Sequence, residues 1–66
     1  MNQYLIYNRD SGHVLGAWHV ESPEAALAAL WADSNAAELM PEVTQQSVDR
    51  WRAGDLVIEV HAGTST

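Results

Sequence analysis

Three runs of aromatic, branched and aliphatic residues predict the strands of a small β-sheet. Residues 4–7 and 14–20 form two of these runs, and the turn-forming residues 8–12 lie between them. Two runs joined in this way predict an N-terminal β-hairpin. Residues 56–61, Leu-Val-Ile-Glu-Val-His in sequence, predict a third strand near the C-terminus.

Between the hairpin and the last strand, residues 22–33 have the spacing of a helix. Ser22 can cap its N-terminus, and Pro23 stands at the first helical position, where a missing N–H costs nothing. One apolar face carries residues at i, i+3 and i+4, which are Leu27, Leu30 and Trp31. A second, uncharged stripe consists of Ala25, Ala28, Ala29 and Ala32. A helix that is apolar all round is usually buried, which indicates that something covers this alanine stripe.

The segment that follows allows two interpretations. Residues 36–40 could continue the helix for one turn, until Pro41 interrupts its hydrogen bonds. For residues 42–53 we favour a second helix, because Val43, Ser47 and Trp51 share an i, i+4 row and Gly54 suits a C-cap. The alternative is a strand over residues 46–52, joined to the last strand by a turn at residues 53–55. A second helix could cover part of the alanine stripe, whereas a strand would leave the stripe bare and favour dimerisation through it.

These elements predict an α+β fold: a two-layer sandwich with one or two helices on one face of a three-stranded, largely antiparallel sheet. We expect a single domain over residues 1–61 and a flexible tail over residues 62–66. Alternation along the strands gives the sheet two unlike faces. The first is the expected seat of the helix and carries Ile6, Val14, Gly16, Trp18, Val20, Leu56, Ile58 and Val60. The second is half apolar and carries Leu5, Tyr7, His13, Leu15, Ala17, His19, Val57, Glu59 and His61.

Charge and composition narrow the possible functions. The 66 residues include nine Asp and Glu against three Arg and no Lys, for a net charge of −6. Such a surface repels phosphate backbones and anionic lipid, so we expect neither nucleic acid nor a membrane as a partner. No cysteine is present, which excludes disulfides and thiolate metal sites. No apolar run is long enough for a bilayer and no signal peptide is recognisable, so we expect a cytoplasmic protein.

Histidines offer the one candidate metal site. His13 and His19 are about 20 Å apart if they lie on one strand, too far to share an ion. His19, Glu59 and His61 could meet only if the last strand pairs in a favourable register. No spacing predicts a nucleophile–base pair or an acid–base pair. We therefore expect no enzyme, no cofactor and no catalytic residue, and we keep the three-residue metal site as a weaker alternative.

The sequence Arg50-Trp51-Arg52 is the only concentration of positive charge. On a helix the two arginines would point away from Trp51, which favours Trp51 as a core residue between two solvated side chains. The arginines could equally pair with Asp49, Asp55 or the acidic residues of the first helix.

Together these features predict a small, acidic, non-enzymatic interaction or regulatory module, acting as a homodimer or docking on a larger protein. The candidate interface residues lie on the second sheet face and on the alanine stripe: Leu5, Tyr7, Leu15, Ala17, Val57, Ala25, Ala29 and Ala32. The alternative is a small-ligand or metal-binding protein that uses the histidine-bearing sheet face.

Overall fold

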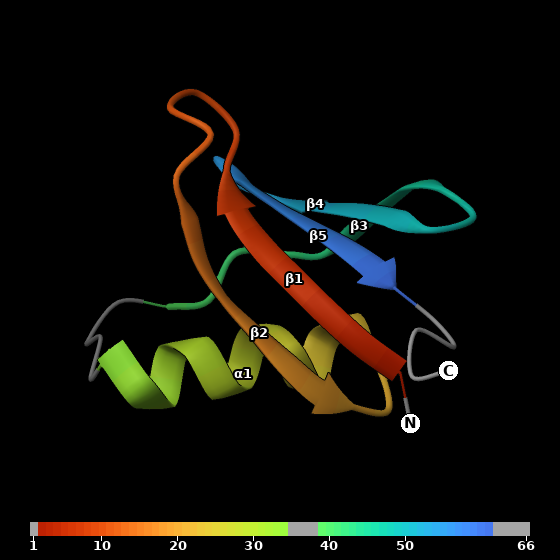
Figure 1. Ribbon diagram of the computed structural model, residues 1–66. Helices are drawn as coiled ribbons and strands as arrows, with labels where there is room; N and C mark the ends of the chain where they lie inside the picture. The colour runs from red at the N-terminus through yellow and green to blue at the C-terminus, as the bar shows by residue number, and fades with distance from the viewer. Residues whose placement is uncertain (1, 35–38, 62–66) are drawn as a thin grey trace.

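The computed structural model describes residues 2–34 and 39–61. Its elements follow in the order β1 (Asn2–Asn8), β2 (Val14–Val20), α1 (Pro23–Ser34), β3 (Thr44–Ser47), β4 (Arg50–Ala53) and β5 (Leu56–His61). They form an α+β fold with one helix against one antiparallel sheet, as predicted (Figure 1). Residues 36–38 of the predicted helical turn and the predicted tail lie outside the described residues. Residues 39 and 40 are not helical.

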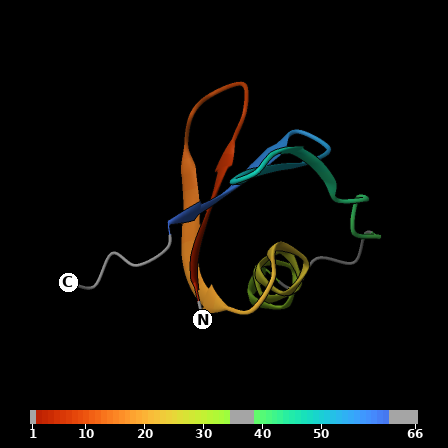
Figure 2. The same ribbon diagram turned by 90° about the vertical axis from the view of Figure 1, so that its right-hand side faces the viewer.

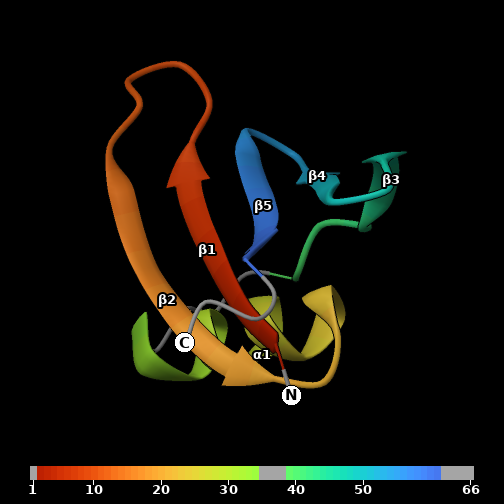
Figure 3. The same cartoon turned by 45° about the vertical axis from the view of Figure 1, so that its right-hand side comes forward.

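The sheet has five strands in the order β2-β1-β5-β4-β3, and every neighbouring pair is antiparallel. The prediction of three strands was therefore wrong by two. The last three strands form a meander whose β5 returns to pair with β1, so the two chain-terminal strands lie at the centre of the sheet. β2 and β3 form its edges (Figure 3).

The additional strands arise from residues 42–53, for which the preferred helix prediction was wrong. This segment is a hairpin in which β3 pairs with β4, and the turn at Gly54 and Asp55 leads into β5. Gly54 has a φ of 63°, which suits a tight turn as well as it suits a helix C-cap. The alternative interpretation, a strand, was closer to the observed structure, although the segment forms two short strands.

Helix α1 begins as the sequence predicts. The Ser22 hydroxyl accepts a hydrogen bond from the Ala25 N–H at 3.1 Å, and Pro23 is the first helical residue. The helix buries Ala26 and Leu27 against the sheet and packs mainly on β2, with further contacts to β1 and β5. Figure 2 shows the sheet curving around it, so that one face is concave and holds the helix while the opposite face stays uncovered.

The core lies between the helix and the concave face. Its buried members are Tyr4, Ile6, Ala26, Leu27, Ala53 and Ile58. Around them pack partly buried side chains, among them Trp18, Trp31 and Trp51. Trp51 meets the ring of Tyr4 edge to face, with ring centroids 5.9 Å apart. Trp51 is therefore a core residue, as predicted, although it comes from a strand rather than from a helix.

One residue changes face relative to the prediction. The β1–β2 register shifts after the Ile6–Gly16 pair, and Tyr7 then pairs with Val14, which leaves Leu15 as an extra residue on β2. Val14 therefore lies on the face of Tyr7, the uncovered face, and is 51% exposed. Strict alternation placed it in the core because alternation takes no account of a bulge.

No helix among the described residues is long and apolar enough to cross a membrane.

Candidate binding pocket on the uncovered sheet face

The uncovered face divides into an apolar half and a cationic half. The apolar half lies over β1 and β2, where Leu5 pairs with Ala17 and Val14 and Leu15 are exposed at 51% and 40%. The cationic half lies over β5, β4 and β3 and contains a pocket of about 460 Å³. The two halves meet along β1, because Tyr7 belongs to the pocket while its partner Val14 belongs to the apolar half.

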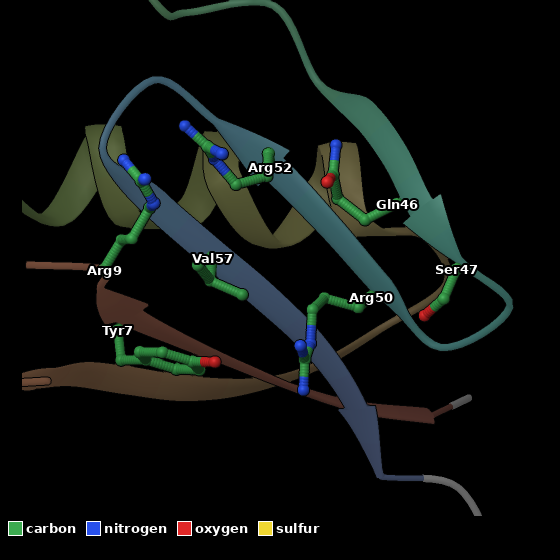
Figure 4. A pocket seen from close by; sticks show the side chains of 7 residues that line it. All are labelled: Tyr7, Arg9, Gln46, Ser47, Arg50, Arg52 and Val57. Atoms are coloured by element: carbon green, nitrogen blue, oxygen red, sulfur yellow. The ribbon is translucent and has the colours of Figure 1, made fainter.

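Seven side chains line the pocket, and Figure 4 shows them from close by: Tyr7, Arg9, Gln46, Ser47, Arg50, Arg52 and Val57. Every Arg of the chain is among them, and no Asp or Glu is. In a chain of net charge −6, this arrangement concentrates the opposite sign at one place.

Strand geometry explains how the three arginines converge. Arg50 and Arg52 are two residues apart on β4, so both side chains lie on the uncovered face while Trp51 points into the core. Arg9 follows the end of β1, where its backbone N–H donates to the Asp55 carbonyl at 2.8 Å. This hydrogen bond ties the start of the β1–β2 loop to the β4–β5 turn and brings Arg9 beside Arg52.

Arg50 is held by a carboxylate beside the pocket. Its Nη2 lies 3.0 Å from Glu59 Oε2, and the Tyr7 hydroxyl donates a hydrogen bond of 2.8 Å to the same oxygen. That hydrogen bond, followed by desolvation and the negative charge of Glu59, raises the pKa of Tyr7 above its ordinary value of 10.0, while nearby Arg50 opposes the rise. The alternative pairing of Arg50 with Asp49, Asp55 or the helix is replaced by this cross-strand pair with Glu59.

Arg52 and Arg9 have no carboxylate partner within the described residues. One terminal nitrogen of Arg52 donates to the Gly54 carbonyl at 3.2 Å, but its Nε is buried and has no hydrogen-bond acceptor in that part of the chain. Figure 4 shows the guanidinium groups of Arg9 and Arg52 on one side of Val57 and that of Arg50 on the other. A buried donor without an acceptor is costly, and among the described pocket residues only Arg52 has one.

The predicted interface residues are distributed over several environments. Leu5 is half-buried and Leu15 and Ala17 are exposed, all near the sheet edge formed by β2. Tyr7 belongs to the pocket, and Val57 is only 5% exposed at its floor. On the helix, Ala32 and Ala28 are exposed, whereas Ala25 and Ala29 are half-buried.

The predicted histidine site is only partly assembled. Gln3 pairs with His19 on one side and with His61 on the other, so the two histidines lie two strands apart, about 10 Å between backbones. His61 Nε2 lies 3.7 Å from Glu59 Oε1, but that carboxylate already serves Tyr7 and Arg50. Within the described ranges, no three His, Cys, Asp or Glu side chains form a group that could hold a metal ion.

Sequence reasoning missed the pocket, and in particular Arg9, Gln46 and Ser47. These residues converge because β3 and β4 form a hairpin, and we had predicted a helix for that segment. The available signal was the i, i+2 spacing of Arg50 and Arg52, which places both on one face of a strand.

No protein-family model matches this chain, and neither does any curated protein or solved structure.

Proposed function

We propose that this chain is a non-enzymatic interaction module that acts as a homodimer, formed through the apolar half of its uncovered sheet face. One observation carries the proposal: large aliphatic side chains, Val14 and Leu15, are exposed where the helix does not cover the sheet. Leu5 and Ala17 extend the same surface along β1 and β2.

The amount of apolar surface favours this half over the alanine stripe. Covering the exposed part of a Val or Leu side chain contributes about 1–2 kcal/mol, and the single methyl of Ala28 or Ala32 contributes less. The strand interpretation of residues 46–52 predicted a bare stripe that favours dimerisation, but Ala25 and Ala29 are half-buried, so the stripe offers a smaller driving force.

The distribution of charge favours a second copy of this chain as the partner that covers the apolar half. β2 contains no Asp, Glu or Arg, and the carboxylate beside Leu5, that of its β5 partner Glu59, is paired with Arg50. Two copies can therefore meet over β2 without opposing unpaired like charges, although each carries a net charge of −6. A dimer through the cationic half would instead place arginine against arginine.

The oligomeric state of the full chain tests this proposal. Multi-angle light scattering and sedimentation equilibrium between about 5 and 200 μM should give a mass of twice 7.2 kDa at the upper end. A measured mass equal to that of a single chain throughout this range would overturn the proposal, whatever any variant does.

A pair of leucine substitutions locates the interface. Leu15→Asp should raise the dimer dissociation constant at least about ten-fold, because it places two carboxylates in an apolar contact. Leu39→Asp is the matched control, since it adds the same charge at an exposed leucine elsewhere, and it should change the constant less than about two-fold. Equal effects of the two variants would contradict this location of the interface. Circular dichroism verifies that each variant is folded.

A further inference from the structure

We propose that the arginine-lined pocket is a binding site for a small ligand bearing a compact dianionic oxyanion, such as a phosphate monoester. The pocket lies on the cationic half of the uncovered face and shares no lining residue with the proposed dimer surface, which it borders where Tyr7 pairs with Val14. The ligand site is therefore proposed independently of the dimer.

The charge balance of the pocket sets the charge of the ligand. Three guanidinium groups line it. Two carboxylates lie beside it: Glu59 pairs with Arg50, and Asp49 accepts a hydrogen bond of 3.0 Å from the Ser47 hydroxyl. Two positive charges, those of Arg9 and Arg52, are left without a carboxylate among the described residues. A phosphate monoester carries close to two negative charges at neutral pH, because its second pKa is about 6.

The geometry of the donors sets the kind of anion. A guanidinium presents N–H groups in a planar fork that matches two oxygens of a phosphate or carboxylate. The buried Nε of Arg52 has no acceptor in the described structure, and Arg9 lies on the same side of Val57 (Figure 4). An oxyanion between these two arginines would accept hydrogen bonds from both and relieve the repulsion between them.

The remaining lining favours a small ligand with an apolar part. The ring of Tyr7 and the side chain of Val57 supply apolar surface beside the arginines, and Gln46 and Ser47 supply polar groups at the β3 side. A volume of about 460 Å³ is within the range of small-molecule sites. A nucleic acid would extend well beyond this pocket onto a surface that is acidic overall, which opposes its binding.

Ligand titrations on the intact chain test the site. We would record ¹H–¹⁵N spectra, including the arginine Nε–H signals, while adding phenyl phosphate, inorganic phosphate or benzoate at constant ionic strength and pH 7.5. Phenyl phosphate should give saturable shifts at Arg9, Arg52 and the backbone of residues 46–52, with a dissociation constant below about 5 mM. Inorganic phosphate should bind more weakly at the same residues, since it lacks the apolar part, and the monoanion benzoate more weakly still.

Substitutions separate the site from a general charge effect. Arg52→Gln and Arg9→Gln should each weaken phenyl phosphate binding at least about ten-fold, and Arg52→Lys should weaken it several-fold because it keeps the charge but removes the planar fork. Asn2→Asp is the matched control: it lowers the net charge by the same one unit at the far end of β1 and should change the constant less than about two-fold.

Three results would overturn the proposal. The first is the absence of saturable shifts up to about 20 mM phenyl phosphate. The second is an equal loss of affinity in Asn2→Asp and Arg9→Gln, which would indicate bulk charge. The third is benzoate binding as tightly as phenyl phosphate, which would remove the requirement for a dianion. Because Leu15 lies outside the pocket, the Leu15→Asp variant should bind phenyl phosphate normally even where it is monomeric.

Discussion

At the scale of single residues, Glu59 organises the middle of the uncovered face. Its Oε2 accepts the hydrogen bond of Tyr7 and pairs with Arg50, and its Oε1 faces His61 at 3.7 Å. These contacts join three adjacent strands, β1, β5 and β4, on the side opposite the core. Glu59 therefore holds Tyr7 and Arg50 in place at the boundary of the arginine-lined pocket.

The Tyr7 phenol should report this arrangement. Its pKa is raised above 10.0 chiefly by the hydrogen bond to Glu59, so the stabilisation it represents is fully present below pH 10 and is lost as pH rises through the folded-state pKa. Glu59→Gln should lower the pKa of Tyr7, measured by NMR of the tyrosine rings during an alkaline titration. Tyr7→Phe assigns the signal. An unchanged or higher Tyr7 pKa in Glu59→Gln would contradict the hydrogen bond as its main cause.

At the scale of elements, residues 22–34 and 42–53 show what the sequence could and could not predict. The helix was predictable because Ser22, Pro23 and the spacing of Leu27, Leu30 and Trp31 act within a few residues of one another. The β3–β4 hairpin was not. Its edge strand β3 is polar and exposed along its whole length, so no alternation of buried and exposed residues marks it. Without this hairpin the pocket could not be predicted, because Arg50 and Arg52 share a face only on a strand.

The N-cap of α1 gives a direct test of this local control. Ser22→Ala removes the acceptor for the Ala25 N–H and should lower the free energy of unfolding by about 0.5–2 kcal/mol in urea denaturation. Ser34→Ala is the control at the other end, where the exposed Ser34 hydroxyl donates to the Trp31 carbonyl, and it should cost less than about 0.5 kcal/mol. Equal costs at the two ends would show that the cap does not determine helix stability.

At the scale of the whole molecule, one helix and one face of a curved sheet must supply the stability. Only three large side chains are fully buried among the described residues: Ile6, Leu27 and Ile58. Two come from the central strands β1 and β5, and one comes from the helix. A domain of this size has a free energy of unfolding of about 3–10 kcal/mol in total, so each of these side chains accounts for a large share.

Leu27 is the helix's contribution to that core, and its truncation should show how much the fold depends on the contact between its two layers. Leu27→Ala removes a side chain that is 1% exposed and should lower the free energy of unfolding by about 2–4 kcal/mol, measured by urea denaturation at one fixed chain concentration. Leu39→Ala, at a leucine that is 94% exposed, should change it by less than about 0.5 kcal/mol. A cost below about 1 kcal/mol for Leu27→Ala would mean that the sheet is stable without the helix. The proposed dimerisation has a further consequence, because binding to a second copy would stabilise the folded chain. The urea midpoint should then rise with chain concentration in the wild type and less so in Leu15→Asp.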